Sequence, residues 1–280
     1  MNNSIPIRTR HLFQELDDLL IQKLKTIQTD QWDAPTLAGK WTVKHLAAHL
    51  LDGNLRALSM IRDGYFGENP GPISSYQDLV TFLNQLNADW VTATNRLSPK
   101  VLISLLESSG KEYRNLIKSL KPFEIAVFSV AWAGEEESLN WFHVAREYTE
   151  KWHHIQQIFT ALDPSDQTLL CKRLYQPYLE TSMRALPHHY REVKAPKGTL
   201  VKITIEGQFI QTWWLKREEK VWQLLPFSKV APKVQLHIPD NLAWRIFTKG
   251  VSYENALNSV QVIGEEDLAK PVLKMLAVMA

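Results

Sequence analysis

Several residue types and patterns that mark particular classes of protein are scarce in this chain. It holds one cysteine, Cys171, in 280 residues, which excludes an internal disulfide and a thiolate metal cluster. Its apolar runs fall well short of the roughly 20 residues that a membrane-spanning helix requires. Its first residues lack the apolar stretch of a secretory signal peptide. These absences predict a cytoplasmic protein with no membrane partner.

An excess of either charge is also missing. The chain has 32 lysines and arginines against 30 aspartates and glutamates, for a net charge of +2. A nucleic-acid-binding surface needs clustered basic residues, so no nucleic-acid partner is expected. Glycine-rich phosphate loops and nucleophile elbows are absent as well, which removes the commonest sequence signals of nucleotide chemistry and serine hydrolysis.

The chain does contain a change of pattern near residue 193. Apolar residues recur at a spacing of about 3.6 through the first two-thirds, which predicts helices. Later segments, VKITIEG and FIQTWWLK among them, are rich in β-branched and aromatic residues, as in an antiparallel meander. The predicted fold class is therefore α plus α+β. It combines an up-down helical bundle over residues 1–190 with a small α+β domain over residues 191–280.

Capping residues indicate where several of the predicted helices begin or end. Thr42 and Ser98 stand where a side chain accepts hydrogen bonds from first-turn amides, and Gly64 stands where a helix would end. Ser138 or Asn140 is the expected cap of the fifth helix. The predicted helices of the first part cover residues 8–27, 42–63, 76–97, 98–120, 138–159 and 166–186. Two more are predicted over residues 239–250 and 265–280.

The stretch EYTEKWHHIQQI, residues 147–158, holds two carboxylates and two adjacent histidines. On a helix, Glu150 and His154 lie one turn apart on one face, whereas His153 points about 100° away. In the second predicted helix, His49 has apolar neighbours and is expected to face inward. An inward histidine facing a Glu/His pair is how helical bundles build metal sites. The alternative is a hydrogen-bonded core histidine beside a polar seam between helices.

As a metal site, His49, Glu150 and His154 would form a set of two histidines and one carboxylate. Such a set leaves a position open for water or substrate, as in catalytic zinc sites, and it also suits non-haem iron. His143 and Glu147 extend the same stripe of the fifth helix. They would either orient a ligand imidazole or be partly exposed helix residues.

Two motifs resemble those of a known family. WTVKHLAAHL is similar to the second-helix signature of the mycothiol-dependent maleylpyruvate isomerase N-terminal family, a branch of the DinB-like metal-binding four-helix bundles. EKWHHIQ resembles the second metal motif of that family. The resemblance implies ligands at His49, Glu150 and His154 and implies that His153 is not one. The segments WRIFTKG and VIGEED are similar to the sterol-carrier-protein-like α+β domain of the family.

The resemblance also implies cofactors and a chemistry. It implies a divalent metal ion, zinc first with nickel or iron as alternatives, and activation of a low-molecular-weight thiol. A carboxylate substrate would need a cationic clamp, for which Arg56, Arg245 and Lys249 are the candidates. For Arg56, a salt bridge to Asp52 or Glu147 is the alternative.

Three functions are compatible with these residues, each with a small molecule as partner. The first is a divalent-metal-dependent enzyme, a thiol-dependent transferase or isomerase acting on a small electrophilic or carboxylate substrate. The second is a metal-dependent hydrolase that uses a metal-bound water, with Glu147 as general base. The third is a non-enzymatic protein that binds lipid or another small molecule, with tryptophans of the second domain lining a pocket. A homodimer is an open option.

Overall fold

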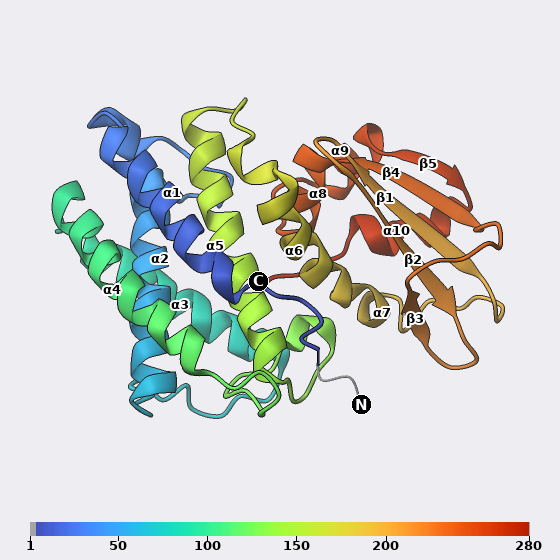
Figure 1. Ribbon diagram of the computed structural model, residues 1–280, viewed down its shortest axis with the longest axis horizontal. Coiled ribbons are helices and arrows are strands. Elements are labelled where there is room, and N and C mark those ends of the chain that lie inside the picture. The colour runs from blue at the N-terminus through green and yellow to red at the C-terminus, as the bar shows by residue number, and fades with distance from the viewer. Residues whose placement is uncertain (1–3, 280) are drawn as a thin grey trace.

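The computed structural model describes residues 4–279, which form a helical region followed by a sheet with helices of its own (Figure 1). This arrangement confirms the fold class α plus α+β. The first strand begins at Leu200, while the predicted division between residues 190 and 191 stays a prediction. Within residues 4–279, no helix has the length and apolar character needed to cross a membrane.

Five long helices build the helical region. They are α1 Phe13–Thr26, α2 Val43–Ala57, α3 Tyr76–Thr94, α4 Pro99–Ser119 and α5 Asn140–Leu162. Both α1 and α2 contact α4 and α5, which closes a ring around a shared apolar core. Helix α3 packs against α2. The ring brings α2 and α5, which carry the predicted metal ligands, side by side.

The predicted N-terminal caps of α2 and α4 are present, whereas that of α5 is not. The side chains of Thr42 and Ser98 accept from amides in the first turns of α2 and α4, as predicted. The predicted cap of α5 is wrong, because the helix begins at Asn140 without a side-chain cap. The Ser138 hydroxyl instead accepts from the amide of Val130 at 2.9 Å. Ser138 is therefore used to fold the preceding loop.

Two shorter helices lead from the helical region to the sheet, and they are α6 Lys172–Ser182 and α7 Leu186–His189. The ring of Trp152 on α5 stacks on Tyr175 of α6, with 4.8 Å between centroids. The same ring lies 6.4 Å from Trp244, which belongs to the second part of the chain. This aromatic stack joins the two parts.

The sheet is mixed, with the strand order β3-β2-β1-β4-β5. Its strands are β1 Leu200–Glu206, β2 Ile210–Arg217, β3 Trp222–Leu225, β4 Val234–Pro239 and β5 Gln261–Gly264. The first three are antiparallel neighbours, as the meander pattern predicts, whereas β4 runs parallel to β1. Helices α8 Asp240–Phe247 and α10 Glu266–Leu273 contact β4.

The end of the chain departs from the predicted pattern. The helix predicted over residues 265–280 is wrong in length, because α10 ends at Leu273. Pro271 lies in its last turn and removes an amide donor there. The segment that follows is not helical and runs back to the helical region (Figure 1). Helix α9 Tyr253–Ser259 and strand β5 are elements that the sequence patterns did not predict.

Candidate metal centre

Helix α5 is buried on almost every side, although its sequence contains many polar residues. His143, His153, His154 and Gln157 are each at most 9% exposed. Buried polar groups generally need hydrogen-bond partners, so the partners of each ring reveal its role.

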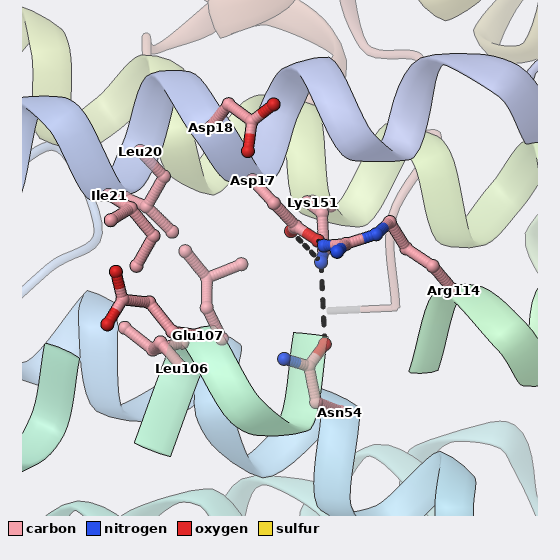
Figure 2. Close-up of a pocket in the computed structure, with 10 residues that line it drawn as sticks. Asp17, Asp18, Leu20, Ile21, Asn54, Leu106, Glu107, Arg114 and Lys151 are labelled. Atoms are coloured by element: carbon pink, nitrogen blue, oxygen red, sulfur yellow. Dashed lines mark hydrogen bonds and ion pairs between the residues drawn. The ribbon is translucent and has the colours of Figure 1, made fainter. Parts of the chain in front are cut away.

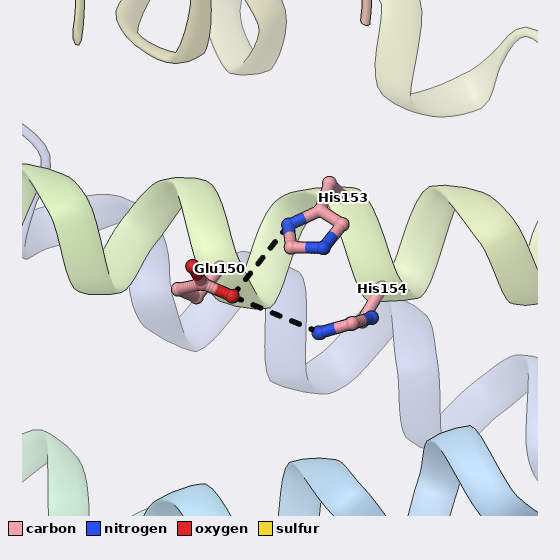
Figure 3. A group of neighbouring side chains, drawn as sticks. All are labelled: Glu150, His153 and His154. Atoms are coloured by element: carbon pink, nitrogen blue, oxygen red, sulfur yellow. Dashed lines mark ion pairs between the residues drawn. The ribbon is translucent and has the colours of Figure 1, made fainter. Parts of the chain in front are cut away.

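Glu150, His153 and His154 form a compact group on this helix (Figure 3). Each brings one possible ligand atom within 4.8 Å of the others. Oε2 of Glu150 lies 3.7 Å from Nε2 of His154 and 3.9 Å from Nδ1 of His153. Glu150 and His154 therefore face one another across one helical turn.

The hydrogen bond of His154 leaves one nitrogen free for a ligand. Its Nδ1 lies 2.9 Å from Oε1 of Gln157, so the ring donates there and Nε2 carries the lone pair. Burial, reinforced by His153, lowers the pKa of His154 to about 3, so the ring is neutral at pH 7. Metal-binding histidines are neutral and typically donate through their second nitrogen to a protein acceptor. Nε2 of His154 is therefore in the state that metal binding requires.

The neighbouring His153 has a different hydrogen bond. Its Nδ1 lies 2.9 Å from the carbonyl oxygen of Thr149, which can only accept, so Nδ1 carries the hydrogen. The nitrogen nearest to Glu150 is thus a donor with no lone pair to offer. Helical spacing predicts that the His153 side chain points about 100° away from that of His154. The two ring centroids are nevertheless only 3.9 Å apart. Burial lowers the pKa of His153 to about 4. His153 therefore packs beside the group as a neutral ring.

His49 comes from α2 and lies beside this group rather than within it. Its ring centroid is 4.7 Å from that of His154 and 5.0 Å from that of Trp41. Its Nδ1 is buried and has no hydrogen-bond partner among residues 4–279. Burial, together with the charges of His154 and Arg56, lowers the pKa of His49 well below its usual value. An unpaired buried nitrogen is unfavourable, and a ligand would relieve it.

Glu150 is the most accessible member of the group, with a side chain that is 29% exposed. Burial raises the pKa of its carboxyl group above the usual value. The His154 imidazole and the Arg146 guanidinium act in the opposite direction, while the Glu147 carboxylate raises this pKa further. Burial therefore outweighs the neighbouring positive charge at this carboxyl group.

Arg146 lies one turn before Glu150 on α5 and contacts two polar side chains of the same helix. Its Nη2 lies 2.9 Å from Nδ1 of His143 and 2.7 Å from Oε1 of Glu147. The Tyr113 hydroxyl donates to the other oxygen of Glu147 at 2.9 Å. Burial alone would raise the pKa of Glu147, but Arg146, His143, Tyr113 and Arg56 outweigh it and lower that pKa. Glu147 is therefore ionised, with both oxygens engaged.

Arg56 forms one of the two salt bridges considered for it. Its Nε lies 2.8 Å from Oδ2 of Asp52, and its Nη2 lies 3.4 Å from Oδ1 of Asn87 on α3. Its charge still lowers the pKa values of both His49 and Glu147. Arg56 is thus held beside the group by Asp52, and its role toward a substrate stays a prediction.

The two cations predicted from the second part of the chain are Arg245 and Lys249. The guanidinium carbon of Arg245 is 5.4 Å from the ring centroid of Trp244, while Lys249 is exposed. Within the described part of the chain, neither side chain has a hydrogen bond or salt bridge to Glu150 or His154. Their role in substrate binding stays a prediction.

A second polar cluster occupies the inside of the ring formed by α1, α2, α4 and α5 (Figure 2). Asp17 accepts from Lys151 Nζ at 2.5 Å and also from Arg114. Lys151 Nζ lies 3.4 Å from Oδ1 of Asn54. These side chains line a cavity of about 190 Å³. They are paired with one another, so the cluster links helices and is separate from the metal centre.

Comparison with known proteins identifies the helical region. The family described as "Mycothiol maleylpyruvate isomerase N-terminal domain" matches residues 13–159, just over half of the chain. The chain belongs to this family. The resemblance inferred from the two helical motifs is thereby confirmed, and the match includes α1 to most of α5.

A named protein and two solved structures are also similar to this chain. The chain is 26% identical over 116 residues to the "Putative metal-dependent hydrolase" of Bacillus mycoides (strain KBAB4), a match that covers 40% of this chain and 61% of that protein. It therefore spans about three fifths of that relative's length. The crystal structure of the mycothiol-dependent maleylpyruvate isomerase superposes with a TM-score of 0.53 at 14% identity, and a histidine-to-alanine mutant with 0.54 at 13%. Each superposition covers 91% of this chain and 92% of the other, so the shared fold includes the sheet.

Family motifs did not reveal every residue around the group. Arg146 was missed, although its position one turn before Glu150 places it on the same face of the helix. Tyr113 from α4 was missed as well. Its sequence distance from α5 leaves no local signal, since only the packed fold brings it there.

Proposed function

We propose that this protein is a divalent-metal-dependent enzyme whose ion is held by His49, Glu150 and His154. The observation that carries the proposal is the state of His154. Its Nδ1 donates to Gln157, which leaves a neutral Nε2 facing the Glu150 carboxylate at 3.7 Å. An imidazole and a carboxylate presented in this way suit a divalent ion. His49 would supply the third ligand, a second nitrogen donor, from the facing helix, and its unpartnered Nδ1 supports the assignment.

The ion and the surrounding residues would have different roles in the reaction. When bound, a divalent ion supplies a Lewis acid that lowers the pKa of a thiol or of water. Zinc is favoured for this ligand set, with nickel and iron as alternatives. Gln157 orients the His154 ring, while Glu147 holds Arg146 in place. Burial keeps the ligand rings neutral.

The proposed reaction is a thiol-dependent transfer or isomerisation of a small electrophilic or carboxylate substrate. Membership of a family named for a mycothiol-dependent isomerase supports a low-molecular-weight thiol as co-substrate. The charges of Arg146 and Arg56 beside the centre support an anionic substrate, because a carboxylate would be attracted to them. A cytoplasmic location and a homodimer remain predictions.

A metal-dependent hydrolase is the second candidate. The name of the Bacillus mycoides relative supports it. The predicted general base, Glu147, has a lowered pKa, and each of its oxygens already accepts from a partner, Tyr113 or Arg146. A base works best with a pKa near the working pH, so Glu147 is poorly suited to the task. Thiol-dependent chemistry is therefore preferred.

The lipid-binding alternative has less support. Trp222, one of the tryptophans considered for a pocket, is only 3% exposed. It packs edge-on against Tyr190 and donates its ring N–H to the carbonyl oxygen of Val193. This side chain belongs to the core beneath the sheet and does not face a ligand.

The first test is metal content after loading with zinc. We expect one equivalent per chain, and we expect His49→Gln, Glu150→Gln and His154→Gln to weaken binding by more than about 100-fold, because each loses a direct ligand. His153→Gln and His45→Gln are the matched controls, since His45 lies one turn before His49 on the same helix. Equal metal content in wild type and all three ligand variants would contradict the proposed site.

The second test separates the two reactions. Metal-loaded protein is assayed with a panel of thiols against an electrophilic acceptor, and with amides and esters in the absence of thiol. Consumption of the electrophile only when a thiol and the metal are both present is expected. Hydrolysis without any thiol would support the second candidate instead.

A further inference from the structure

The segment before α1 forms one wall of a cavity in the helical region. The cavity lies where this segment meets the end of α4 and the start of α5, and its volume is about 370 Å³. Sites for small molecules commonly measure roughly 300–1,000 Å³. We name this cavity the basic pocket, for the charges of the residues that line it.

The basic pocket and the candidate metal centre lie on opposite sides of α5. Trp141 lines the pocket and precedes Glu150 by nine residues, about two and a half helical turns. The two side chains therefore project in opposite directions. None of Glu150, His153 and His154 lines the pocket. A ligand bound there would not depend on the metal ion.

Positive charge is concentrated around the basic pocket. Arg8, Arg10 and Lys118 line it together with His11, and no acidic residue does. The chain as a whole is nearly neutral, with a net charge of +2, so this is a local excess. Arg8 and Lys118 are exposed, and in the part of the chain that the structure describes neither pairs with a carboxylate. An anion would therefore be attracted to the pocket.

Arg10 is held in a fixed orientation in the wall of the pocket. Its guanidinium donates through Nη1 to the carbonyl oxygen of Lys118, at 3.2 Å, and through Nη2 to that of Leu120. Both carbonyls lie at the C-terminal end of α4, where a helix leaves its last carbonyl oxygens unpaired. Two of the five N–H groups of Arg10 are used in this way, which leaves the others for a ligand. A cation that is fixed before binding loses little conformational entropy when an anion binds.

Thr9 has a buried hydroxyl group that the fold does not use. The residue lines the pocket and is only 1% exposed. It precedes the helical turn Arg10–Leu12, yet its side chain makes no capping hydrogen bond there. Within residues 4–279, its Oγ1 has no hydrogen-bond partner. An unpaired buried hydroxyl is unfavourable, and an oxygen of a bound ligand would relieve it.

Apolar side chains complete the wall of the basic pocket. Ile7 and Val144 are 5% and 3% exposed and belong to the core of the helical region. The half-buried ring of Trp141 stacks on Phe142, with 5.2 Å between centroids. Packing fixes these side chains, so they offer a preformed apolar surface beside the cations.

We propose that the basic pocket binds a small organic anion with a carboxylate at one end and an aromatic or aliphatic body. Arg10, with Arg8 and Lys118, would neutralise the carboxylate. The hydroxyl of Thr9 would donate to one carboxylate oxygen, and Trp141 would pack against the body. The proposal adds a second ligand site to the chain and is independent of the proposed metal-dependent reaction.

The fluorescence of anilinonaphthalene sulfonate tests the proposal, because this aromatic anion emits strongly only when its rings leave water. It is titrated into the full-length, metal-free protein, and we expect saturable binding of one equivalent per chain. The double variant Arg8→Gln, Lys118→Gln should bind it about 10-fold more weakly, since two cations are lost. The matched control Lys100→Gln, Lys111→Gln removes two exposed cations of α4 that do not line the pocket and should bind like wild type.

Thr9 offers a second matched pair of variants. Thr9→Val keeps the shape of the side chain and removes the hydroxyl, whereas Thr9→Ser keeps the hydroxyl. We expect Thr9→Val to bind the probe about 3- to 10-fold more weakly and Thr9→Ser to bind like wild type. Valine also removes an unpaired buried group, so Thr9→Val should melt at least as high as wild type, which separates lost binding from lost folding.

Competition defines the class of ligand. Phenylbutyrate should displace the probe. Phenylbutanol, which lacks the charge, and acetate, which lacks the apolar body, should not displace it at the same concentrations. Displacement by the alcohol or by acetate as effective as that by phenylbutyrate would overturn the proposal.

Results with the variants can overturn the proposal as well. Wild type that binds no probe, or unchanged affinity in the pocket variants, would do so. An equal loss in the control pair would assign binding to general charge. Binding abolished by zinc loading or by His154→Gln would place the probe at the metal centre. In each of these cases the pocket is no anion site, while the proposed metal-dependent function is unaffected.

Discussion

At the scale of single residues, hydrogen-bond acceptors give adjacent histidines different properties. His153 donates to a carbonyl of the preceding turn, and His154 donates to Gln157 of the following one. Only the second arrangement leaves a lone pair directed at Glu150. Both rings carry their proton on Nδ1, so the difference between a packing residue and a candidate ligand is which ring nitrogen lies nearest to Glu150.

His143 yields a prediction about pH. Burial, reinforced by Arg146 and opposed by Glu147, lowers the pKa of His143 to about 4. The unfolded chain has a higher pKa, near 6.5, so it binds more protons between these values. Stability is therefore expected to fall as pH drops from about 6.5 toward 4. Between pH 7 and pH 5 this group should account for about 2 kcal/mol of that loss.

His143→Gln tests this assignment, because glutamine keeps an acceptor for Arg146 but does not titrate. Urea unfolding of metal-free wild type and variant is measured at pH 7 and pH 5. The variant should lose less stability on acidification than wild type. An identical loss in the two proteins would refute the assignment.

At the scale of secondary-structure elements, Asp17 joins three helices. From α1 it accepts from Lys151 of α5 and from Arg114 of α4. Asp17→Asn would leave two cations without their carboxylate in the interior, which typically costs about 3–5 kcal/mol. Asp18→Asn is the matched control, since the neighbouring carboxylate is exposed and should change stability by less than about 0.5 kcal/mol. Equal unfolding free energies for the two variants would show that Asp17 does not stabilise the helices in this way.

Elements with strong local signals were predictable from the sequence. The apolar spacing of α1 to α5 and the caps at Thr42 and Ser98 are local features, and the helices follow them. The parallel pairing of β4 with β1 depends on residues far apart in the chain, so spacing could not reveal it. The path of the chain after α10 depends on contacts with Phe247 and His189. Glu150 and His154 were paired by helical spacing alone, whereas the contact of Met279 with Tyr76 required the folded chain.

At the scale of the whole molecule, Trp152 connects the helical region with the sheet. Its fully buried ring contacts Tyr175, Tyr178 and Trp244. Trp152→Ala should lower the free energy of unfolding by about 3–5 kcal/mol, since it leaves a large cavity at the junction. Trp152→Phe retains part of the stack and should lose clearly less. A loss below about 1 kcal/mol for the alanine variant in chemical denaturation would contradict this role.

The route of residues 274–279 has a practical consequence for work with this protein. Since the sulfur of Met279 lies 3.8 Å from the hydroxyl of Tyr76 on α3, a peptide fused after residue 280 would begin next to the helical region, which carries the candidate ligands. A polyhistidine tag in that position would supply imidazoles that compete for the same ion and would hold them at high effective concentration. Metal content and affinity are therefore best measured with untagged protein, or with the tag removed.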